Sequence, residues 1–289
     1  MQINRARNYF LLIALSSSLF ISCNIINPAD PVPSYLKIDG VTLNTTNATE
    51  GSNSNKIVDA WAYAGGQDLG VYNLPALFPV LASGPTQIII SPGIEDNGIA
   101  ASRTIYPFYF PDTQTIDLQP KIIYPLHPVF KYRPGTVFSF IEDFESGNIF
   151  NRIDGDTTLT RIVSSPDIFE GAGCGKIFLD SLHTYTEVET ANAYIISTNV
   201  TNPIYLELNY KCTQPFQVGI MAHKGTEFIR YYNWTINPKA EWNKIYLNMT
   251  DDIRQLAADD YRILIKATYD VTVKPDAGIF FDNIKLVHQ

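Results

Sequence analysis

Charged side chains are scarce in this sequence of 289 residues. They make up 17% of the chain, against roughly 25% in an average globular protein. This scarcity argues against a helical bundle or coiled coil, because both depend on sequences rich in Glu and Lys. Lys and Arg number 21 against 29 Asp and Glu, so the net charge is −8. An acidic chain without clustered basic residues is not expected to bind nucleic acid, since phosphate neutralisation requires Lys and Arg.

Sequence signatures of common enzymes are also missing. The chain contains four histidines, His127, His183, His223 and His288. None of them belongs to a His-Glu-x-x-His zinc motif, and no Gly-x-Ser-x-Gly elbow marks an α/β-hydrolase. A carboxylate cluster at residues 142–145 lies on one predicted strand, where it cannot place an acid and a base on opposite sides of a glycosidic bond. We therefore expect no catalytic activity.

The N-terminus predicts export. Arg5 and Arg7 precede an apolar stretch at residues 9–21 that serines interrupt, and Ser22 then precedes Cys23. This is the pattern of a secretory signal, and the stretch is too short and broken to favour a membrane span. The run Leu-Phe-Ile-Ser-Cys that ends at Cys23 resembles the bacterial lipobox, which implies a lipid on Cys23. The alternative is an ordinary cleaved signal with an incidental cysteine.

These features predict a signal peptide at residues 1–22 and a lipidated Cys23 followed by an extended, proline-containing tether to residue 34. Loss of the two signal arginines lowers the net charge from −8 to −10. The resemblance implies an outer-membrane lipoprotein of a Bacteroidetes-like bacterium, facing the periplasm or the medium.

The rest of the sequence predicts β-structure. Short runs rich in β-branched and aromatic residues recur between clusters of Gly, Pro, Asn and Asp, and residues 205–210 largely alternate apolar with polar. Residues 250–258 predict a helix of about two turns. This spacing is typical of sandwiches and barrels. We expect an all-β chain with two β-sandwich domains, at residues 35–130 and 136–289, joined by a linker at 131–135.

The first domain contains a strand at residues 57–64, a Gly-Gly turn at 65–66, a second strand that ends at 74–75, and a β-branched run at 87–90. This order is similar to the prealbumin-like or PEGA-like modules of bacterial surface proteins, and implies an Ig-like β-sandwich. Three tyrosines are expected to pack between the two domains: Tyr106, Tyr109 and Tyr124.

The second domain contains four short motifs in a fixed order. It opens with Glu-Asp-Phe-Glu at residues 142–145, continues with a Gly-bounded strand at 171–179 and with Trp242 before a strand, and closes with Phe-Asp-Asn-Ile at 281–284. This order resembles the galactose-binding-like jelly rolls, which include many carbohydrate-binding modules. The resemblance spans most of residues 138–288 and implies a jelly roll that binds a glycan.

Many members of that group hold a structural calcium ion between the first and last strands, so the resemblance also implies calcium. Calcium takes six to eight oxygen ligands from carboxylates, carbonyls and water. Glu145 and Asp282 stand at matching positions, and Asp143 is a further candidate. The alternative is that these carboxylates are solvated or pair with Lys176 and Lys285.

A sugar site needs an aromatic face to stack on the ring and polar groups to bond its hydroxyls. Residues 228–234 supply both. Strict alternation places Phe228, Arg230, Tyr232 and Trp234 on one face of a strand. Arg230, Tyr232 and Trp234 are therefore our candidate ligand-binding residues. The alternative is that this face is covered by a loop.

Two further cysteines, Cys174 and Cys212, lie in or beside β-runs of the second domain. An exported protein permits a disulfide between them, while buried free thiols are equally ordinary in strands. Both alternatives remain open from the sequence.

The sequence as a whole predicts a non-catalytic lipoprotein of the bacterial cell envelope. Its lipid would hold it at the membrane, and its jelly roll would bind a polysaccharide or another surface ligand. Calcium is the one cofactor that we expect. The alternative is a structural or assembly subunit that docks other envelope proteins and binds no glycan.

Overall fold

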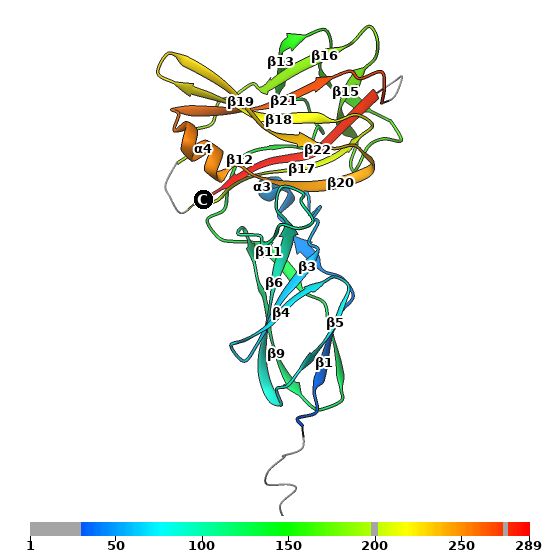
Figure 1. Ribbon diagram of the computed structural model, residues 1–289, viewed down its shortest axis with the longest axis vertical. Helices are drawn as coiled ribbons and strands as arrows, with labels where there is room; N and C mark the ends of the chain where they lie inside the picture. The colour runs from blue at the N-terminus through cyan, green and yellow to red at the C-terminus, as the bar shows by residue number, and fades with distance from the viewer. Residues whose placement is uncertain (1–29, 198–201, 274–276) are drawn as a thin grey trace, which may run out of the picture.

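The structure is a computed structural model that describes residues 30–197, 202–273 and 277–289 (Figure 1). The expected signal peptide and Cys23 lie outside these residues. Within the described ranges, no helix is long and apolar enough to cross a membrane. The chain forms two β-sandwich domains, and the second lies across one end of the elongated first domain. The prediction of an all-β chain with two sandwiches is confirmed.

The first domain extends from β1 to β11. Its elements are β1 (Ser34–Ile38), β2 (Thr42–Asn44), α3 (Asn47–Glu50), β3 (Asp59–Ala64), β4 (Gln67–Asn73), β5 (Ala76–Val80), β6 (Gly84–Glu95), β7 (Arg103–Ile105), β8 (Tyr109–Phe110), β9 (Asp112–Leu118), β10 (Ile123–Leu126) and β11 (Val129–Tyr132). Strands β4, β3, β6, β7 and β9 form one sheet, and β10-β1-β5 and β2-β11-β8 form two smaller sheets around the same core. The predicted turn between β3 and β4 consists of Gly65 and Gly66, both with the positive φ that glycine adopts without strain.

The second domain extends from β12 to β22. Its elements are β12 (Val137–Glu142), β13 (Phe150–Gly155), β14 (Leu159–Val163), β15 (Gly173–Leu179), β16 (Tyr185–Thr190), β17 (Ile204–Cys212), β18 (Phe216–Lys224), β19 (Glu227–Ile236), β20 (Lys239–Asn248), α4 (Thr250–Leu256), β21 (Asp260–Thr268) and β22 (Ala277–His288). Their antiparallel pairing gives the two packed sheets of a jelly roll.

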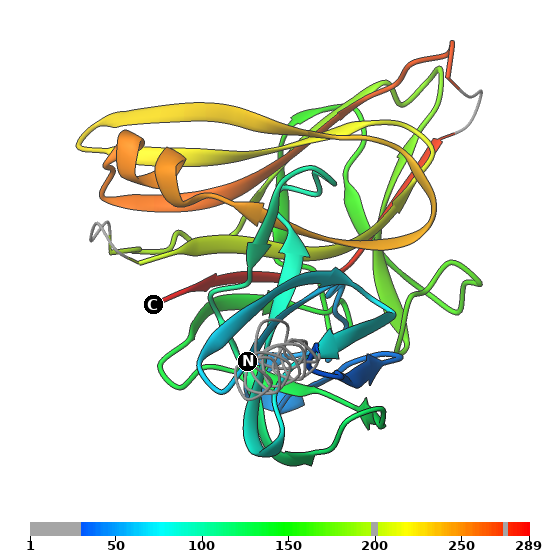
Figure 2. The same ribbon diagram turned by 60° about the horizontal axis from the view of Figure 1, so that its bottom comes forward.

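One sheet of the jelly roll, here called the inner sheet, has the order β14-β15-β22-β17-β20 with β12 paired to β22, and it contacts the first domain. The other, the outer sheet, has the order β13-β16-β21-β18-β19. Figures 1 and 2 agree that the outer sheet lies on the far side of the inner sheet from the first domain, and Figure 1 labels β18, β19 and β21 above β17, β20 and β22. The outer sheet therefore has a free face that points away from the first domain.

Aromatic side chains from both domains pack at the junction. The ring centre of Tyr106 lies 5.3 Å from that of Tyr205 and 4.8 Å from that of Tyr246. The hydroxyls of Tyr109 and Tyr246 are 3.4 Å apart. The prediction for Tyr106 and Tyr109 is confirmed. The prediction for Tyr124 is wrong, because its hydroxyl bonds within the first domain at the end of β9.

Glu207 is buried at the centre of this junction, with none of its surface exposed. Its carboxylate accepts hydrogen bonds from the hydroxyls of Tyr106 (2.7 Å) and Tyr132 (2.8 Å) of the first domain, and pairs with Lys244 of β20 at 2.9 Å. Burial favours the neutral acid, but Lys244 and Lys285 outweigh it and hold the pKa of Glu207 below its usual value. The inner sheet is thus joined to the first domain by a charged, fully buried contact.

The loop between β6 and β7 adds a second connection. Asn97, with φ of 55°, donates its backbone N–H to the carbonyl of Tyr246 at 3.0 Å. Its side-chain oxygen accepts the backbone N–H of Asn248 at 2.8 Å and the indole N–H of Trp234 at 3.1 Å. Asn248 belongs to the inner sheet and Trp234 to the outer sheet, so one asparagine of the first domain bridges both sheets of the second.

The substitution Glu207→Gln tests the junction. It leaves Lys244 buried without its counter-ion, and removal of one partner from a buried ion pair costs about 3–5 kcal/mol. We expect urea denaturation to show a loss of that size in the free energy of unfolding. The matched control is Glu227→Gln at the exposed start of β19, where a surface change of about 0.5 kcal/mol or less is expected. Equal losses in the two variants would contradict the role of Glu207.

Two candidate ligand sites

The free face of the outer sheet contains a hollow of about 500 Å³, within the roughly 300–1,000 Å³ range of small-molecule pockets. The residues that line it come from all five strands of this sheet: Ile153, Glu189, Met221, Phe228, Arg230 and Arg262. Strand register explains the grouping, because Met221 pairs with Arg230 on one side and with Arg262 on the other. The two arginines therefore flank a buried methionine at the floor of the hollow.

Phe228 forms an aromatic wall of this hollow. Its side chain is 62% exposed, and its ring stacks on the imidazole of His223 with centres 4.6 Å apart. Across the hollow, the Arg262 guanidinium lies 3.8 Å from the Glu189 carboxylate. The hollow thus combines one exposed ring with planar charged groups that can bond hydroxyls in pairs.

A polar cluster around Glu187 fixes Arg230 in position. The buried Glu187 carboxylate accepts hydrogen bonds from the hydroxyls of Tyr232 (2.5 Å) and Tyr185 (3.0 Å), and Arg230 Nε lies 3.5 Å from it. Lys266 Nζ lies 3.9 Å from the centre of the Tyr232 ring. Burial, followed by the bond to Glu187, raises the pKa of Tyr185 to about 12, and the pKa of Tyr232 is raised for the same reasons. Tyr232 therefore supports Arg230 and is partly covered itself.

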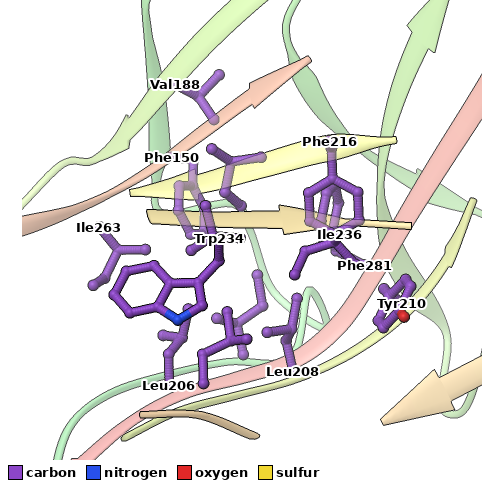
Figure 3. Close-up of a cluster of buried hydrophobic side chains, with 14 of the residues drawn as sticks. Phe150, Val188, Leu206, Leu208, Tyr210, Phe216, Trp234, Ile236, Ile263 and Phe281 are labelled. Atoms are coloured by element: carbon purple, nitrogen blue, oxygen red, sulfur yellow. The ribbon is translucent and has the colours of Figure 1, made fainter. Parts of the chain in front are cut away.

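Trp234 does not lie on this face, and its prediction as a ligand-binding residue is wrong. The register of β18 and β19 shifts between Val218, which pairs with Trp234, and Gly219, which pairs with Tyr232, so one residue of β19 is left over. Such a bulge reverses the alternation of the strand. Trp234 is 7% exposed and lies in the sandwich core, near Leu206 and Ile263 in Figure 3. Strict alternation missed the bulge.

A second pocket, of about 520 Å³, lies where the first domain meets the inner sheet, beside its central strand β22. The structure brings together here the three predicted metal ligands, Asp143, Glu145 and Asp282, and adds Glu170. Thr45, Asn47, Ser52 and Asn53 of the first domain complete the polar lining.

Asp282 is the unusual member of this pocket, here called the junction pocket. It is 1% exposed, and its Oδ2 has no hydrogen-bond partner within the described residues. Burial raises the pKa of Asp282 to about 8, and the negative charges of Glu170 and Glu145 add to the rise. A buried carboxylate with a free oxygen, close to two other carboxylates, is suited to a proton or a cation.

The carboxylates of Glu145 and Asp143 accept hydrogen bonds from backbone N–H groups. Glu145 accepts the N–H of Ala172 at 2.9 Å, and Asp143 accepts the N–H of Glu145 at 3.1 Å. A Cβ at Gly171, whose φ is +67°, would lie 2.0 Å from the Glu145 carboxylate, so glycine is required for this approach. Within the described ranges, no three His, Cys, Asp or Glu side chains converge as a ready metal centre. A cation here would depend on Asp282, carbonyl groups and water.

The cysteines form no disulfide. Cys174 and Cys212 are free, and both are buried. They lie on β15 and β17, which flank β22 from opposite sides. Two strand spacings separate them by about 9.6 Å, beyond the ~7 Å that a disulfide can span. Of the two alternatives, the disulfide is therefore wrong.

Comparisons with solved structures find carbohydrate-binding modules among the neighbours. One is the family 29 module CBM29-2 solved with mannohexaose, at 14% identity and a TM-score of 0.35 over 53% of this chain and 92% of the module. Another family 29 module has 12% identity and a TM-score of 0.35. A bacteriophage CBA120 tailspike enzymatic domain has 12% identity and a TM-score of 0.38, over 57% of this chain and 26% of the domain. No family model and no curated protein matches the sequence.

No motif in the sequence marks Glu187, Glu189 and Arg262 as site residues. The first two alternate along β16 and therefore share a face, which is a readable signal. The pairing of β16 with β21, of β21 with β18 and of β18 with β19 is what brings them next to Arg262 and Arg230. The pairing of β16 with β21 joins segments about 75 residues apart and has no local signature.

The substitution Trp234→Ala tests the corrected placement. Truncation of a buried tryptophan costs about 3–5 kcal/mol of unfolding free energy, and the bond to Asn97 is lost as well. The control Phe228→Ala removes an exposed ring from the same strand and should change stability by about 0.5 kcal/mol or less. Urea denaturation of both variants measures the difference. If Trp234→Ala were as stable as the parent, Trp234 would not be a core residue.

Proposed function

We propose that the second domain is a non-catalytic glycan-binding module and that its site is the hollow on the free face of the outer sheet. The proposal rests on one observation: an exposed aromatic ring, Phe228, stands beside two guanidinium groups and a carboxylate around a hollow of about 500 Å³. Sugar rings present an apolar face for stacking and hydroxyls for paired hydrogen bonds, and these side chains offer both.

Binding is favoured over catalysis by the state of the carboxylates. Glu189 is paired with Arg262, and Glu187 is paired with Arg230 and bonded by two tyrosines. Glycoside hydrolysis needs two carboxyl groups free to flank the bond that is cleaved, whereas both of these already have partners.

Affinity electrophoresis through gels that contain a panel of soluble polysaccharides tests the site. Phe228→Ala and Arg262→Gln are expected to weaken the retarding interaction at least about ten-fold, which corresponds to ~1.4 kcal/mol. Phe178→Ala is the matched control, since Phe178 is a part-exposed phenylalanine on β15 of the inner sheet. If all three variants are retarded to the same extent as the parent, the hollow is not the binding site. If no glycan retards the parent, glycan binding is refuted.

Calcium is proposed for the junction pocket, with Asp282 as its one buried acidic ligand. The support is the unpartnered Oδ2 of Asp282 and the nearby charges of Glu145 and Glu170. A bound divalent cation would keep Asp282 ionised and offset the repulsion among these groups. Its role would be to stabilise the junction between the domains.

The variant Asp282→Asn tests this proposal. Because the pKa of Asp282 is raised in the folded state, the unfolded state releases this proton at lower pH, and calcium-free stability should fall as pH rises from about 4 to 8. Asp282→Asn should lack this fall. At pH 8, millimolar calcium should raise the Tm of the parent and of the exposed control Asp251→Asn, and leave that of Asp282→Asn unchanged. If calcium does not change the Tm of the parent, the proposal is contradicted.

The proposed location is the outer membrane, with the lipid on Cys23 as the anchor. The support is the sequence alone: a basic start, an interrupted apolar stretch, and Ser22 before Cys23. A protein with a net charge of −10 after signal removal is repelled by anionic lipid headgroups, so its attachment would depend on the lipid and not on charge.

A further inference from the structure

The three-stranded sheet β10-β1-β5 has an apolar outer face. Leu36, Phe78 and Val80 point into the core of the first domain. The side chains that alternate with them therefore point outward. These outward residues, with the exposed Leu81 that directly follows β5, form what is here called the apolar face: Tyr35, Lys37, Leu77, Pro79, Leu81, Ile123 and Pro125.

The large side chains of the apolar face are strongly exposed. Leu77 is 56% exposed, Leu81 66% and Ile123 54%. The register places Leu77 and Ile123 on one face, since Tyr35 pairs with Pro79 on one side and with Ile123 on the other, and Leu81 follows the end of β5. Lys37 is paired with Asp39 at 2.9 Å, so its charge is compensated locally. A grouped and exposed apolar surface of this kind marks a contact with another apolar surface.

The chain enters the described structure at the edge of this face. The backbone N–H of Lys121 donates to the carbonyl of Pro33, and that of Tyr35 donates to the carbonyl of Ile122, both at 2.8 Å. Figure 1 shows β1 and β5 in the first domain, below the second domain and beside the point where the chain enters. Eleven residues lead from Cys23 to Ser34, and they reach at most about 40 Å when extended. The apolar face is about 17 Å long along its strands, so an anchor at Cys23 is within reach of all of it.

We propose that the apolar face lies against the lipid bilayer, as a second membrane contact beside the anchor; this inference rests on the proposed lipidation of Cys23. The occupant follows from the position of the face next to the tether and from its chemistry. Leu77, Leu81 and Ile123 suit the boundary between headgroups and acyl chains, and Tyr35 has the apolar ring and polar tip that favour it. Because the protein is acidic, a face without acidic side chains lowers its repulsion from an anionic surface.

The experiment uses the full chain, produced in a bacterium that processes lipoproteins and reconstituted into vesicles of phosphatidylethanolamine and phosphatidylglycerol (3:1). A nitroxide is attached at Leu77→Cys or Leu81→Cys, with Leu182→Cys, 80% exposed on the second domain, as the control. The native Cys174 and Cys212 do not interfere, because both are buried. Power-saturation measurements compare collisions with oxygen, which concentrates in lipid, and with a water-soluble nickel chelate. We expect a ratio of oxygen to nickel collisions several-fold higher at residues 77 and 81 than at residue 182.

The outcomes separate the contact from the anchor. If mass spectrometry finds no acyl group on the parent, or if Cys23→Ser is retained on vesicles as the parent is, the anchor fails and the contact fails with it. The parent could be acylated and retained through Cys23 while all three labels show the same ratio of oxygen to nickel collisions. In that case the anchor stands and the bilayer contact is overturned. Labels at 77 and 81 that are shielded from both reagents indicate a protein or a second copy on the face, which also overturns it.

Discussion

One buried carboxylate decides how the two domains are joined. Glu207 cannot lose its water without partners, and those partners come from both sides: Tyr106 and Tyr132 from the first domain, Lys244 from the second. If the domains separated, the ion pair and both hydroxyl bonds would have to be resolvated together. The protein is therefore better understood as one unit with two cores than as two modules on a flexible linker.

This junction determines which surfaces remain for binding. Strand β17 is buried on both faces, because Leu206 and Leu208 point into the jelly roll while Tyr205 and Glu207 point into the first domain. The inner sheet is consequently closed to ligands along β17. The two candidate sites lie elsewhere: the hollow on the free face of the outer sheet, and the junction pocket beside Asp282 of β22, between the end of β12 and the start of β15.

Local sequence was enough for the strands and the Gly65-Gly66 turn, because alternation and glycine conformation are properties of a few neighbouring residues. It was not enough for Trp234. The one-residue bulge depends on how β19 aligns with β18, and the sequence of β19 alone does not determine that alignment. The same limit applies at residues 205–210. Their alternation predicts a half-buried strand, yet the polar face is covered by a domain about 100 residues earlier in the chain. The sequence did predict that Asp143, Glu145 and Asp282 lie together, as they do in the junction pocket. It did not predict that Glu145 packs against the turn at Gly171, because that contact depends on tertiary structure.

Glu187, Glu189 and Glu207 of the second domain show how one residue type can have different roles. Glu207 is closed off by another domain and can only stabilise. Glu187 is buried beneath its own neighbours on the free face, where Tyr185 and Tyr232 hold it so that Arg230 is fixed before any ligand arrives. A side chain that is already ordered loses little conformational freedom on binding, which leaves more of the contact energy as affinity. Glu189 and Arg262, nearest the hollow and less tightly paired, are then the groups free to exchange their partner for a hydroxyl of the ligand.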